Sequence, residues 1–199
     1  KSMALSITSF TRAATKTVAG NYEHLYVAPL ADISEITWSE TNQVTAITMV
    51  AEKGFADLET DLDSVQFTTN GEGGRGYFSE QNLIAKYSQK TAAMETLVSE
   101  LINGAVAGLV AIRIDRNGNG WISGVAPASM QLKNMPYLKV TEAFDSGENI
   151  EASADGNRYT ITLTRMSGTR EFPIESGSGS LLESILAGTD DFIDGHSSI

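Results

Sequence analysis

The sequence predicts an α+β fold that is mainly β and contains a single long helix. Apolar residues recur at three- and four-residue steps between positions 80 and 103, which is the spacing of a helix with one buried face. Elsewhere apolar residues form short runs or alternate with polar ones, as they do strictly in 159–164. Two of these runs flank Asn117-Gly118-Asn119-Gly120, a sequence typical of a hairpin turn. We therefore expect short strands around one helix.

The 199 residues are enough for one domain with its own hydrophobic core. The N-terminal segment is rich in Thr, Ser and Ala, and 176–180 reads Ser-Gly-Ser-Gly-Ser, which is typical of a flexible linker. Lys1-Ser2 before Met3 resembles a cloning scar, so the native chain is expected to begin at Met3. The expected organisation is an N-terminal arm at 1–20, a β-rich core domain at 21–175, and a linker with a C-terminal tail at 176–199.

The composition is that of an acidic protein without disulfides. The chain has 14 basic and 25 acidic residues and a net charge of -11, which argues against nonspecific attraction to a nucleic acid backbone. It has no cysteine, which excludes a disulfide framework and thiolate metal sites. No apolar run approaches the roughly eighteen residues of a membrane span. No basic segment followed by an apolar core marks the N-terminus, so a soluble protein without a secretion signal is expected.

Four strands are expected before the helix. Pro29 ends the first of them or places it at a sheet edge, because proline cannot donate a hydrogen bond to a strand ladder. A polar turn at 39–43 separates the second strand from the third. In 54–63 several carboxylates surround Phe55 and Leu58, which indicates an acidic loop held by a few apolar anchors. The expected strands are 24–30, 33–38, 44–50 and 65–69.

The predicted helix has a start signal and a stop signal. Ser79 is a favourable N-cap, and Glu80 places a carboxylate near the positive end of the helix dipole. Asn103-Gly104 accepts the left-handed conformation with which helices often end. At about 1.5 Å per residue this helix would be roughly 35 Å long. Its buried face would consist of Leu83, Ile84, Tyr87, Met94, Val98, Leu101 and Ile102.

Five strands and a tail are expected after the helix. In 159–164 the side chains of Tyr159, Ile161 and Leu163 alternate with threonines, which is the pattern of a half-buried strand. Pro173 indicates an edge position for the last strand. A short amphipathic piece at 181–186 precedes an acidic tail. The expected strands are 109–114, 121–125, 137–144, 159–164 and 170–174.

Residues 115–120 reproduce the first half of a calcium-binding loop. Asp115, Asn117 and Asn119 would supply oxygen ligands at positions 1, 3 and 5, and Gly120 stands where such loops require glycine. The twelfth position, which should carry a bidentate glutamate, is Ala126. One carboxylate and two amides compensate poorly for the dehydration of a divalent cation. We therefore interpret this segment as a hairpin turn and assign it no metal.

No other segment carries a catalytic or cofactor-binding signature. The glycine-rich loop 71–76 lacks the Gly-Lys-Ser/Thr ending of a phosphate loop, and Glu72 would repel a phosphate. His24 lies in a predicted strand and His196 in the tail, so neither is placed for a Ser/His/Asp arrangement. We therefore predict no enzyme, no catalytic residue and no cofactor. A run of carboxylates that is typical of a solvated face consists of Asp57, Glu59, Asp61 and Asp63.

Several short motifs built from turn glycines and strand patterns lie between residues 79 and 174. They are Val-Ala-Ile-Arg-Ile-Asp-Arg-Asn-Gly at 110–118, Trp-Ile-Ser-Gly at 121–124, Phe-Asp-Ser-Gly at 144–147, Asp-Gly-Asn at 155–157 and Tyr-Thr-Ile-Thr-Leu-Thr at 159–164. Together with the order of elements, these motifs resemble bacteriophage tail tube proteins over residues 79–174.

This resemblance implies a small antiparallel β-barrel or sandwich with one long flanking helix, at about 80–103, and extended terminal arms. The implied fold is also similar to that of the hexameric Hcp tube of type VI secretion. Members of this group form rings, usually hexameric, that stack into a hollow tube through which DNA passes. The resemblance therefore implies a virion structural protein, assembled in the host cytoplasm, that binds itself and other tail proteins and no membrane. DNA would pass without specific binding, because an acidic wall repels it.

Stacked rings need heterologous contacts, so an edge or arm of each subunit must dock on a different surface of the next. Residues 4–20, 55–76 and 181–186 are candidates for these contacts. The extension after Ser176 departs from the smallest tube proteins, which leaves a connector or terminator protein of related fold as an alternative. A second alternative is a β-sandwich adhesin or carbohydrate-binding module, which would require exposed Trp38 and Trp121.

Overall fold

A computed structural model of the chain describes residues 21–59, 65–71, 79–87, 92–127, 138–145, 158–167, 171–178 and 180–183. Within these residues the protein is α+β and mainly β, as predicted, with strands β1 to β11, the helix α1 and the 3-10 turn η1 (Leu30–Asp32). The predicted N-terminal arm, His196 and the carboxylates Asp61 and Asp63 lie outside the described residues.

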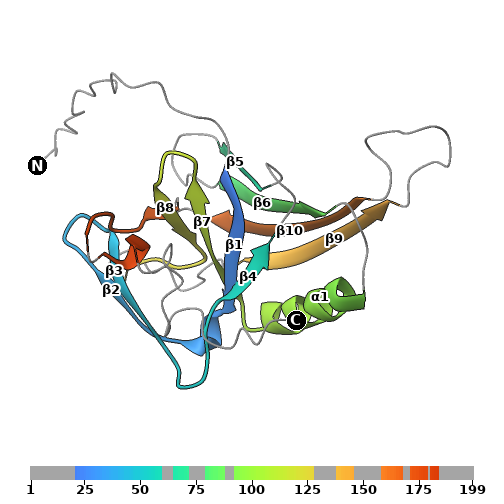
Figure 1. Cartoon of the computed structure of the whole chain (residues 1–199), viewed down its shortest axis with the longest axis horizontal. Helices are drawn as coiled ribbons and strands as arrows, with labels where there is room; N and C mark the ends of the chain where they lie inside the picture. The colour runs from blue at the N-terminus through green and yellow to red at the C-terminus, as the bar shows by residue number, and fades with distance from the viewer. Residues whose placement is uncertain are drawn as a thin grey trace, which may run out of the picture.

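A five-stranded sheet forms the middle of the molecule (Figure 1). Its strands lie in the order β11-β8-β7-β1-β4, and each strand is antiparallel to its neighbours in the sheet. Both of its faces are covered, which explains why Leu109, Val110, Ala111 and Ile112 read as one continuous apolar run. The strands are β1 (Asn21–Pro29), β4 (Ala56–Glu59), β7 (Leu109–Asp115), β8 (Gly120–Ser123) and β11 (Phe172–Pro173).

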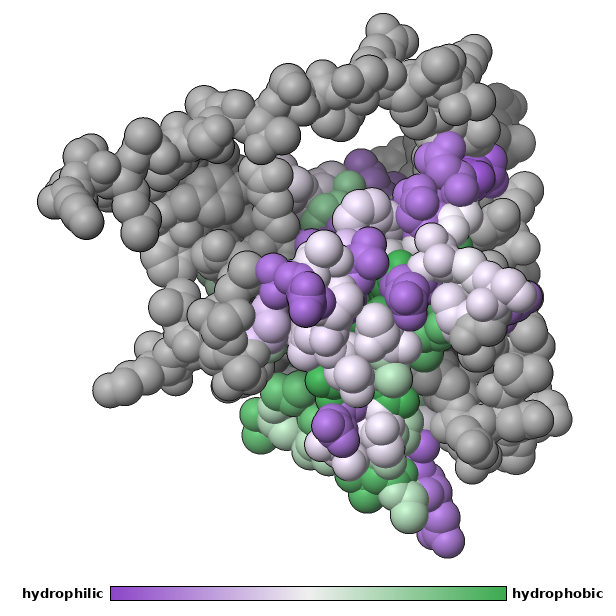
Figure 2. All heavy atoms as spheres, turned by 90° about the vertical axis from the view of Figure 1, so that its left-hand side faces the viewer, coloured by the Kyte–Doolittle hydropathy of each residue, from purple (hydrophilic) through white to green (hydrophobic). Residues whose placement is uncertain are grey.

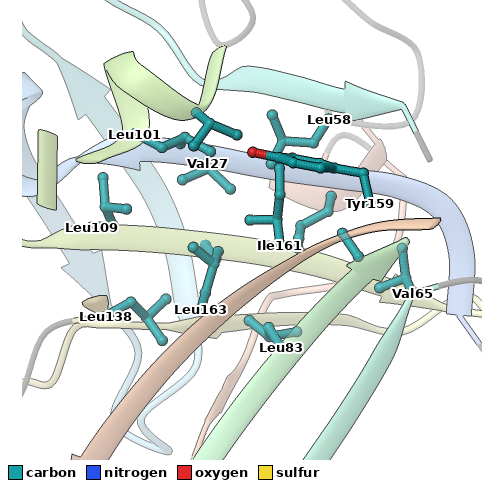
Figure 3. Packing of buried hydrophobic residues seen from close by; sticks show 14 residues of the cluster. Val27, Leu58, Val65, Leu83, Leu101, Leu109, Leu138, Tyr159, Ile161 and Leu163 are labelled. Carbon is teal, nitrogen blue, oxygen red and sulfur yellow. The ribbon is translucent and has the colours of Figure 1, made fainter. Parts of the chain in front are cut away.

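A four-stranded antiparallel sheet packs on one face of the five-stranded sheet. Its order is β5-β6-β10-β9, with β5 (Gln66–Gly71), β6 (Ser79–Tyr87), β9 (Lys139–Asp145) and β10 (Arg158–Ser167). The helix α1 (Ala92–Ala105) contacts β9, β1 and β7. Neither sheet closes on itself among the described strands, so the sandwich form of the prediction is the one observed. Figure 3 shows the core between these sheets, to which Val27, Leu58, Val65, Leu83, Leu101, Leu109, Leu138, Tyr159, Ile161 and Leu163 contribute.

A two-stranded ribbon covers the other face of the five-stranded sheet. It consists of β2 (Ile33–Trp38) and β3 (Val44–Met49), and we call it the ribbon. The C-terminal segment 171–182 lies beside it: Ile174 bridges to Val44 of β3 and donates its N–H to Gly120 O of β8 at 2.9 Å. This second core contains Tyr26, Ala28, Val44, Phe55, Val110, Ile112, Ile114, Ile122, Val125, Ala126, Phe172, Ile174 and Leu182.

The predicted helix at 80–103 is wrong in its first half. Residues 79–87 form β6, which pairs with β5 on one side and β10 on the other, and the helix begins only at Ala92. Gln81, Leu83 and Ala85 are buried in alternation with half-exposed neighbours, which is a strand period. Ser79 pairs with Ser167 in this sheet, so it is no helix cap.

Two further predictions are corrected. Part of the expected acidic loop at 54–63 is strand β4, which pairs with β1, although its anchors Phe55 and Leu58 are buried as expected. The core does not end at 175, because Leu182 is 3% exposed and belongs to it. The expected edge position of Pro173 is confirmed, since β11 is the outermost strand of its sheet. In the described part of the chain, no helix has the length and apolar character needed to cross a membrane.

Candidate functional site

Asp115 is the centre of the β7–β8 hairpin turn. Its Oδ1 accepts the backbone N–H groups of Asn117 at 2.9 Å and Asn119 at 3.0 Å, and its Oδ2 accepts Trp121 Nε1–H at 3.1 Å. Asn119 Nδ2 lies within 3.2 Å of Oδ1 and 3.1 Å of Oδ2. The three residues of the calcium-like pattern therefore meet, but the carboxylate accepts hydrogen bonds from the turn itself.

These hydrogen bonds also control the ionisation of Asp115. Partial burial favours the neutral acid, but the donors of Asn119, Trp121 and Asn117 outweigh it and hold the pKa of Asp115 below its usual value. The described residues contain no group of three or more Asp, Glu or His side chains placed to hold a metal ion.

The remaining candidate residues from the sequence that the structure describes lie on the neighbouring strands β1 and β4. His24 lies in β1 opposite Glu59 of β4. Asp57 of β4 lies opposite Tyr26 of β1, where burial and the charge of Asp57 raise the pKa of Tyr26 to about 12. Residues 72–76 of the glycine-rich loop are outside the described ranges.

A charged cluster that the sequence analysis missed lies between the two large sheets. Arg113 of β7 and Glu171, just before β11, form a bidentate ion pair with Nε to Oε1 at 3.0 Å and Nη2 to Oε2 at 2.6 Å. Their side chains are only 12% and 5% exposed. Ser123 Oγ of β8 donates to Glu171 Oε1 at 3.1 Å. The carboxylate therefore joins three segments of the five-stranded sheet.

The four-stranded sheet contributes a second arginine to this cluster. Arg165 of β10 is 4% exposed, and its Nε donates to Gln81 Oε1 of β6 at 2.7 Å. Burial lowers the pKa of the Arg165 guanidinium to about 10, and the attraction of Glu171 opposes this shift. The influence of Glu171 on Arg165 links the two sheets electrostatically.

Aromatic rings cover the guanidinium of Arg113. Its Cζ lies 4.7 Å from the ring centre of Phe67 in β5 and 5.6 Å from that of Trp121 in β8. Both distances are within the range of cation–π attraction. Because ion-paired arginines with protein partners have little capacity left for a ligand, we interpret this cluster as a structural connection between the layers.

The ribbon is the candidate interaction surface of the molecule. Its inner face packs on the core through Ile36, Trp38 and Ile47, which are all half-buried. In the described part of the chain, β2 and β3 pair as strands only with each other. The outer face is exposed and consists of Ser34, Glu35, Thr37, Ala46 and Thr48.

The ribbon is nearly free of charge. Among the twelve residues of β2 and β3, Glu35 is the single charged one, although the whole chain has a net charge of -11. Soluble proteins usually protect free strand edges with charged residues, proline or bulges. The ribbon has irregular pairing at two places, between Ile33 and Glu35 and between Thr37 and Trp38, but no proline and almost no charge.

Both tryptophans make contacts within the protein. Trp38 is half-buried and packs edge-on against Phe172, with ring centres 5.0 Å apart. Trp121 is also half-buried, donates to Asp115 and lies beside Arg113. Sugar-binding modules need an exposed aromatic face, so these contacts disfavour the carbohydrate-binding alternative.

Comparison of the chain with protein-family models, with curated proteins and with solved structures finds no match.

Proposed function

We propose that this protein is a virion structural protein, a tail tube subunit that assembles into stacked rings around a DNA conduit. The single observation that carries the proposal is the outer face of the ribbon. It is exposed, and Glu35 is the only charge in the ribbon of a chain whose net charge is -11.

Two acidic copies repel each other over most of their surfaces, so contacts between them are favoured where charge is absent. Unpaired strand edges add backbone donors and acceptors that can pair with another chain. The ribbon offers both features, except at Val44, which bridges to Ile174 of the C-terminal segment, and its inner face packs on the core. The geometry therefore supports association of copies through this ribbon.

The conduit part of the proposal rests on charge and on the motif resemblance. The chain has 25 acidic and 14 basic residues, and this excess of negative charge repels a phosphate backbone. DNA inside such a tube would slide without a place to bind. Other tail proteins at the two ends of the tube are the expected additional partners.

The proposal is tested by light scattering of the purified protein over a concentration series, with negative-stain microscopy of the same samples. The expected result is rings or tubes with a central channel. Ala46→Asp, which puts a charge on the outer face of the ribbon, should raise the protein concentration that is needed for assembly at least tenfold. Ala93→Asp is the matched control, because Ala93 is also exposed but lies on α1, away from the ribbon.

A wild-type protein that stays monomeric throughout the series, with no rings on the grid, would contradict the proposal. Assembly that Ala46→Asp and Ala93→Asp change equally would show that the ribbon is not the contact. A monomer would also bring the adhesin alternative forward, and a glycan-binding screen would then test it.

A further inference from the structure

We infer that Asn117 is a site of spontaneous chemical modification, at which the side-chain amide is lost and an aspartate or an isoaspartate is formed. The chain contains four Asn-Gly pairs, at 70–71, 103–104, 117–118 and 119–120. All four lie within the described residues, but only the pair at 117–118 occupies the tip of a hairpin turn. Because the four pairs are chemically identical, the fold decides which of them reacts, whether or not the protein assembles.

The reaction needs no enzyme and no cofactor. The backbone nitrogen of the residue after the asparagine attacks the side-chain Cγ, a five-membered succinimide ring closes, and the amide nitrogen leaves as ammonia. Water then opens the ring, so that one water is consumed and one ammonia is released for each new carboxylate. Opening at one carbonyl gives aspartate, and opening at the other gives isoaspartate, in which the main chain runs through the side-chain carbon. Glycine in the second position favours the attack, because no Cβ shields its nitrogen.

The turn that carries Asn117 lies at the surface. In Figure 1 the β7–β8 turn is at the upper end of its two strands, and Figure 2, which shows the left-hand side of that view, has hydrophilic residues in the upper part of the described surface. Asn117 is exposed, and an added Cβ on Gly118 would meet nothing within 4 Å. Water therefore reaches this peptide, and the space around it admits the ring.

One turn hydrogen bond must open before the Gly118 nitrogen attacks. Gly118 N–H donates to Asp115 O at 2.9 Å. This bond closes an exposed turn and is not part of a buried strand ladder. Exposed turns open locally at much lower free energy than core strands do. The nitrogen is therefore released often enough to react, while the rest of the sheet stays folded.

The neighbouring Asn119-Gly120 pair is held by several contacts. Asn119 Nδ2, the group that would leave, lies 3.1 Å from Asp115 Oδ2, and Asn119 O accepts Asp115 N–H at 2.9 Å. Gly120 O accepts Ile174 N–H at 2.9 Å, and an added Cβ on Gly120 would lie 2.9 Å from Leu182 Cδ1. The Gly120 nitrogen therefore cannot turn towards Asn119 Cγ unless β8 separates from its neighbours.

The other two pairs belong to regular elements. Asn103-Gly104 lies in the last turn of α1, where an added Cβ on Gly104 would lie 3.2 Å from Leu109 Cδ2. Asn70-Gly71 ends β5, and both residues are paired with β6. In each case the backbone must leave a helix or a strand before the ring can close, so we expect slower conversion than at Asn117.

The modification changes both the charge and the geometry of the hairpin. Each product carries one more negative charge than the original chain, and this charge lies beside Asp115. An isoaspartate also adds one atom to the main chain before Gly118. The Asp115 carboxylate then no longer reaches the N–H groups of positions 117 and 119 in the present geometry, where it accepts them at 2.9 and 3.0 Å.

The test is incubation of the folded full-length protein for several weeks in a mildly alkaline buffer, because base removes the proton from the attacking nitrogen. Buffer made with water that contains heavy oxygen labels every carboxylate formed during the incubation, and so distinguishes it from one formed later during digestion. Peptide mapping by mass spectrometry then measures the conversion at each pair. We expect at least fivefold more conversion at Asn117 than at Asn70, Asn103 or Asn119.

The same protein unfolded in guanidinium chloride is the control. Without the fold, the four pairs should convert to within threefold of one another. Equal conversion of the four pairs in the folded protein, or faster conversion at another pair, would overturn the inference. It is also overturned if the folded protein does not react at Asn117 during a period in which the unfolded protein does.

Two variants test the chemistry and the role of Asp115. Asn117→Gln moves the amide one carbon away from the Gly118 nitrogen, so conversion at this position should fall at least tenfold, and unchanged conversion would contradict the ring mechanism. Asp115→Ala removes the carboxylate that holds Asn119 Nδ2, so conversion at Asn119 should rise at least fivefold. Circular dichroism checks that both variants are folded, and unchanged conversion at Asn119 would contradict the protection by Asp115.

Discussion

Arg113 and Glu171 are 58 positions apart in the sequence and form a bidentate ion pair, with the shorter contact at 2.6 Å. The pair connects β7, at the centre of the five-stranded sheet, to the segment that leads into the outermost strand β11. Arg165, on the opposite sheet, is attracted by the same carboxylate. One buried negative charge therefore connects the C-terminal segment to the core, in addition to the backbone hydrogen bond of Ile174 and the packing of Phe172 and Leu182.

Replacement of that charge should destabilise the protein strongly. Glu171→Gln keeps the size of the side chain but leaves the charge of Arg113 buried without its counter-ion, which costs about 3–5 kcal/mol. Urea unfolding measures this loss. Glu175→Gln is the control, because Glu175 is exposed, and it should change the unfolding free energy by less than about 0.5 kcal/mol.

Removal of both charges tests whether the cost comes from the unpaired arginine. The double variant Arg113→Met with Glu171→Leu should be less destabilised than Glu171→Gln alone, because the charge of Arg113 no longer remains buried without its ion-pair partner, while Arg165 loses the attraction of Glu171 in both variants. A double variant that is more destabilised than the single one would show that the pair itself, with its hydrogen bonds, carries the stability.

Asp115→Asn should weaken the protein in a pH-dependent way. The amide presents N–H groups where Oδ2 now accepts from Trp121, so we expect a loss of about 1–3 kcal/mol near neutral pH. Because the folded protein lowers the pKa of Asp115, its contribution is present above about pH 4 and is lost as pH falls through the lowered pKa. The difference between wild type and variant in urea unfolding should therefore shrink below about pH 4. Glu40→Gln, at an exposed position outside this turn, should change the unfolding free energy by less than about 0.5 kcal/mol near neutral pH. A constant difference between wild type and Asp115→Asn at all pH values would contradict the argument.

The strands that the sequence predicted well have strong local signals. Strict alternation places Tyr159, Ile161 and Leu163 in one buried row, and the structure confirms this row in β10. The Asn-Gly turn likewise fixes the β7–β8 hairpin, where Gly118 adopts a φ of 77°. These elements were predictable because their side-chain period and turn residues depend only on neighbours in sequence.

The first half of the predicted helix failed because Leu83 and Tyr87, which are four positions apart, satisfy both periods, whereas Ile84 fits only the helix. Their spacing fits a helix, whereas the burial of Leu83 and Ala85 in alternation fits the strand that forms. The sequence does not show that β5 and β10 lie on either side of this segment and satisfy its backbone groups. Pairing with distant strands therefore decided the outcome.

The arginine cluster escaped prediction because its members are far apart in the chain. Gln81 and Arg165 are 84 positions apart, and nothing local connects them. One signal was present, since Arg165 continues the buried row of Leu163 and therefore places a charge on an apolar face. A charge in such a position needs a partner, so the row predicts a buried polar or charged partner for Arg165, although it identifies neither Gln81 nor Glu171.

Tyr26→Phe should make the protein more resistant to alkaline unfolding. The pKa of Tyr26 is raised to about 12, so the phenol stays neutral in the folded state while it ionises near pH 10 in the unfolded chain. Its contribution to stability is therefore complete below pH 10 and is lost between about pH 10 and 12, a change of roughly 2–3 kcal/mol. Urea unfolding at intervals from pH 8 to 11.5 should show a steeper decline for wild type than for the variant. Parallel curves would contradict this, and Asp57→Asn should give an intermediate slope because it removes part of the shift.

Gly124→Ala should be far more damaging than Gly118→Ala, although both glycines have a positive φ. At Gly124, where φ is 100°, an added Cβ would lie 2.5 Å from Leu109 O and 3.0 Å from Val110 Cα. These are backbone atoms of a buried strand that cannot move aside, so we expect a loss of roughly 3 kcal/mol or more. At Gly118, where φ is 77°, the same Cβ would meet nothing within 4 Å. Only the conformational cost of about 1–2 kcal/mol then remains. Urea unfolding of the two variants gives the comparison, and equal losses would mean that β8 can move away from β7 to admit the methyl group.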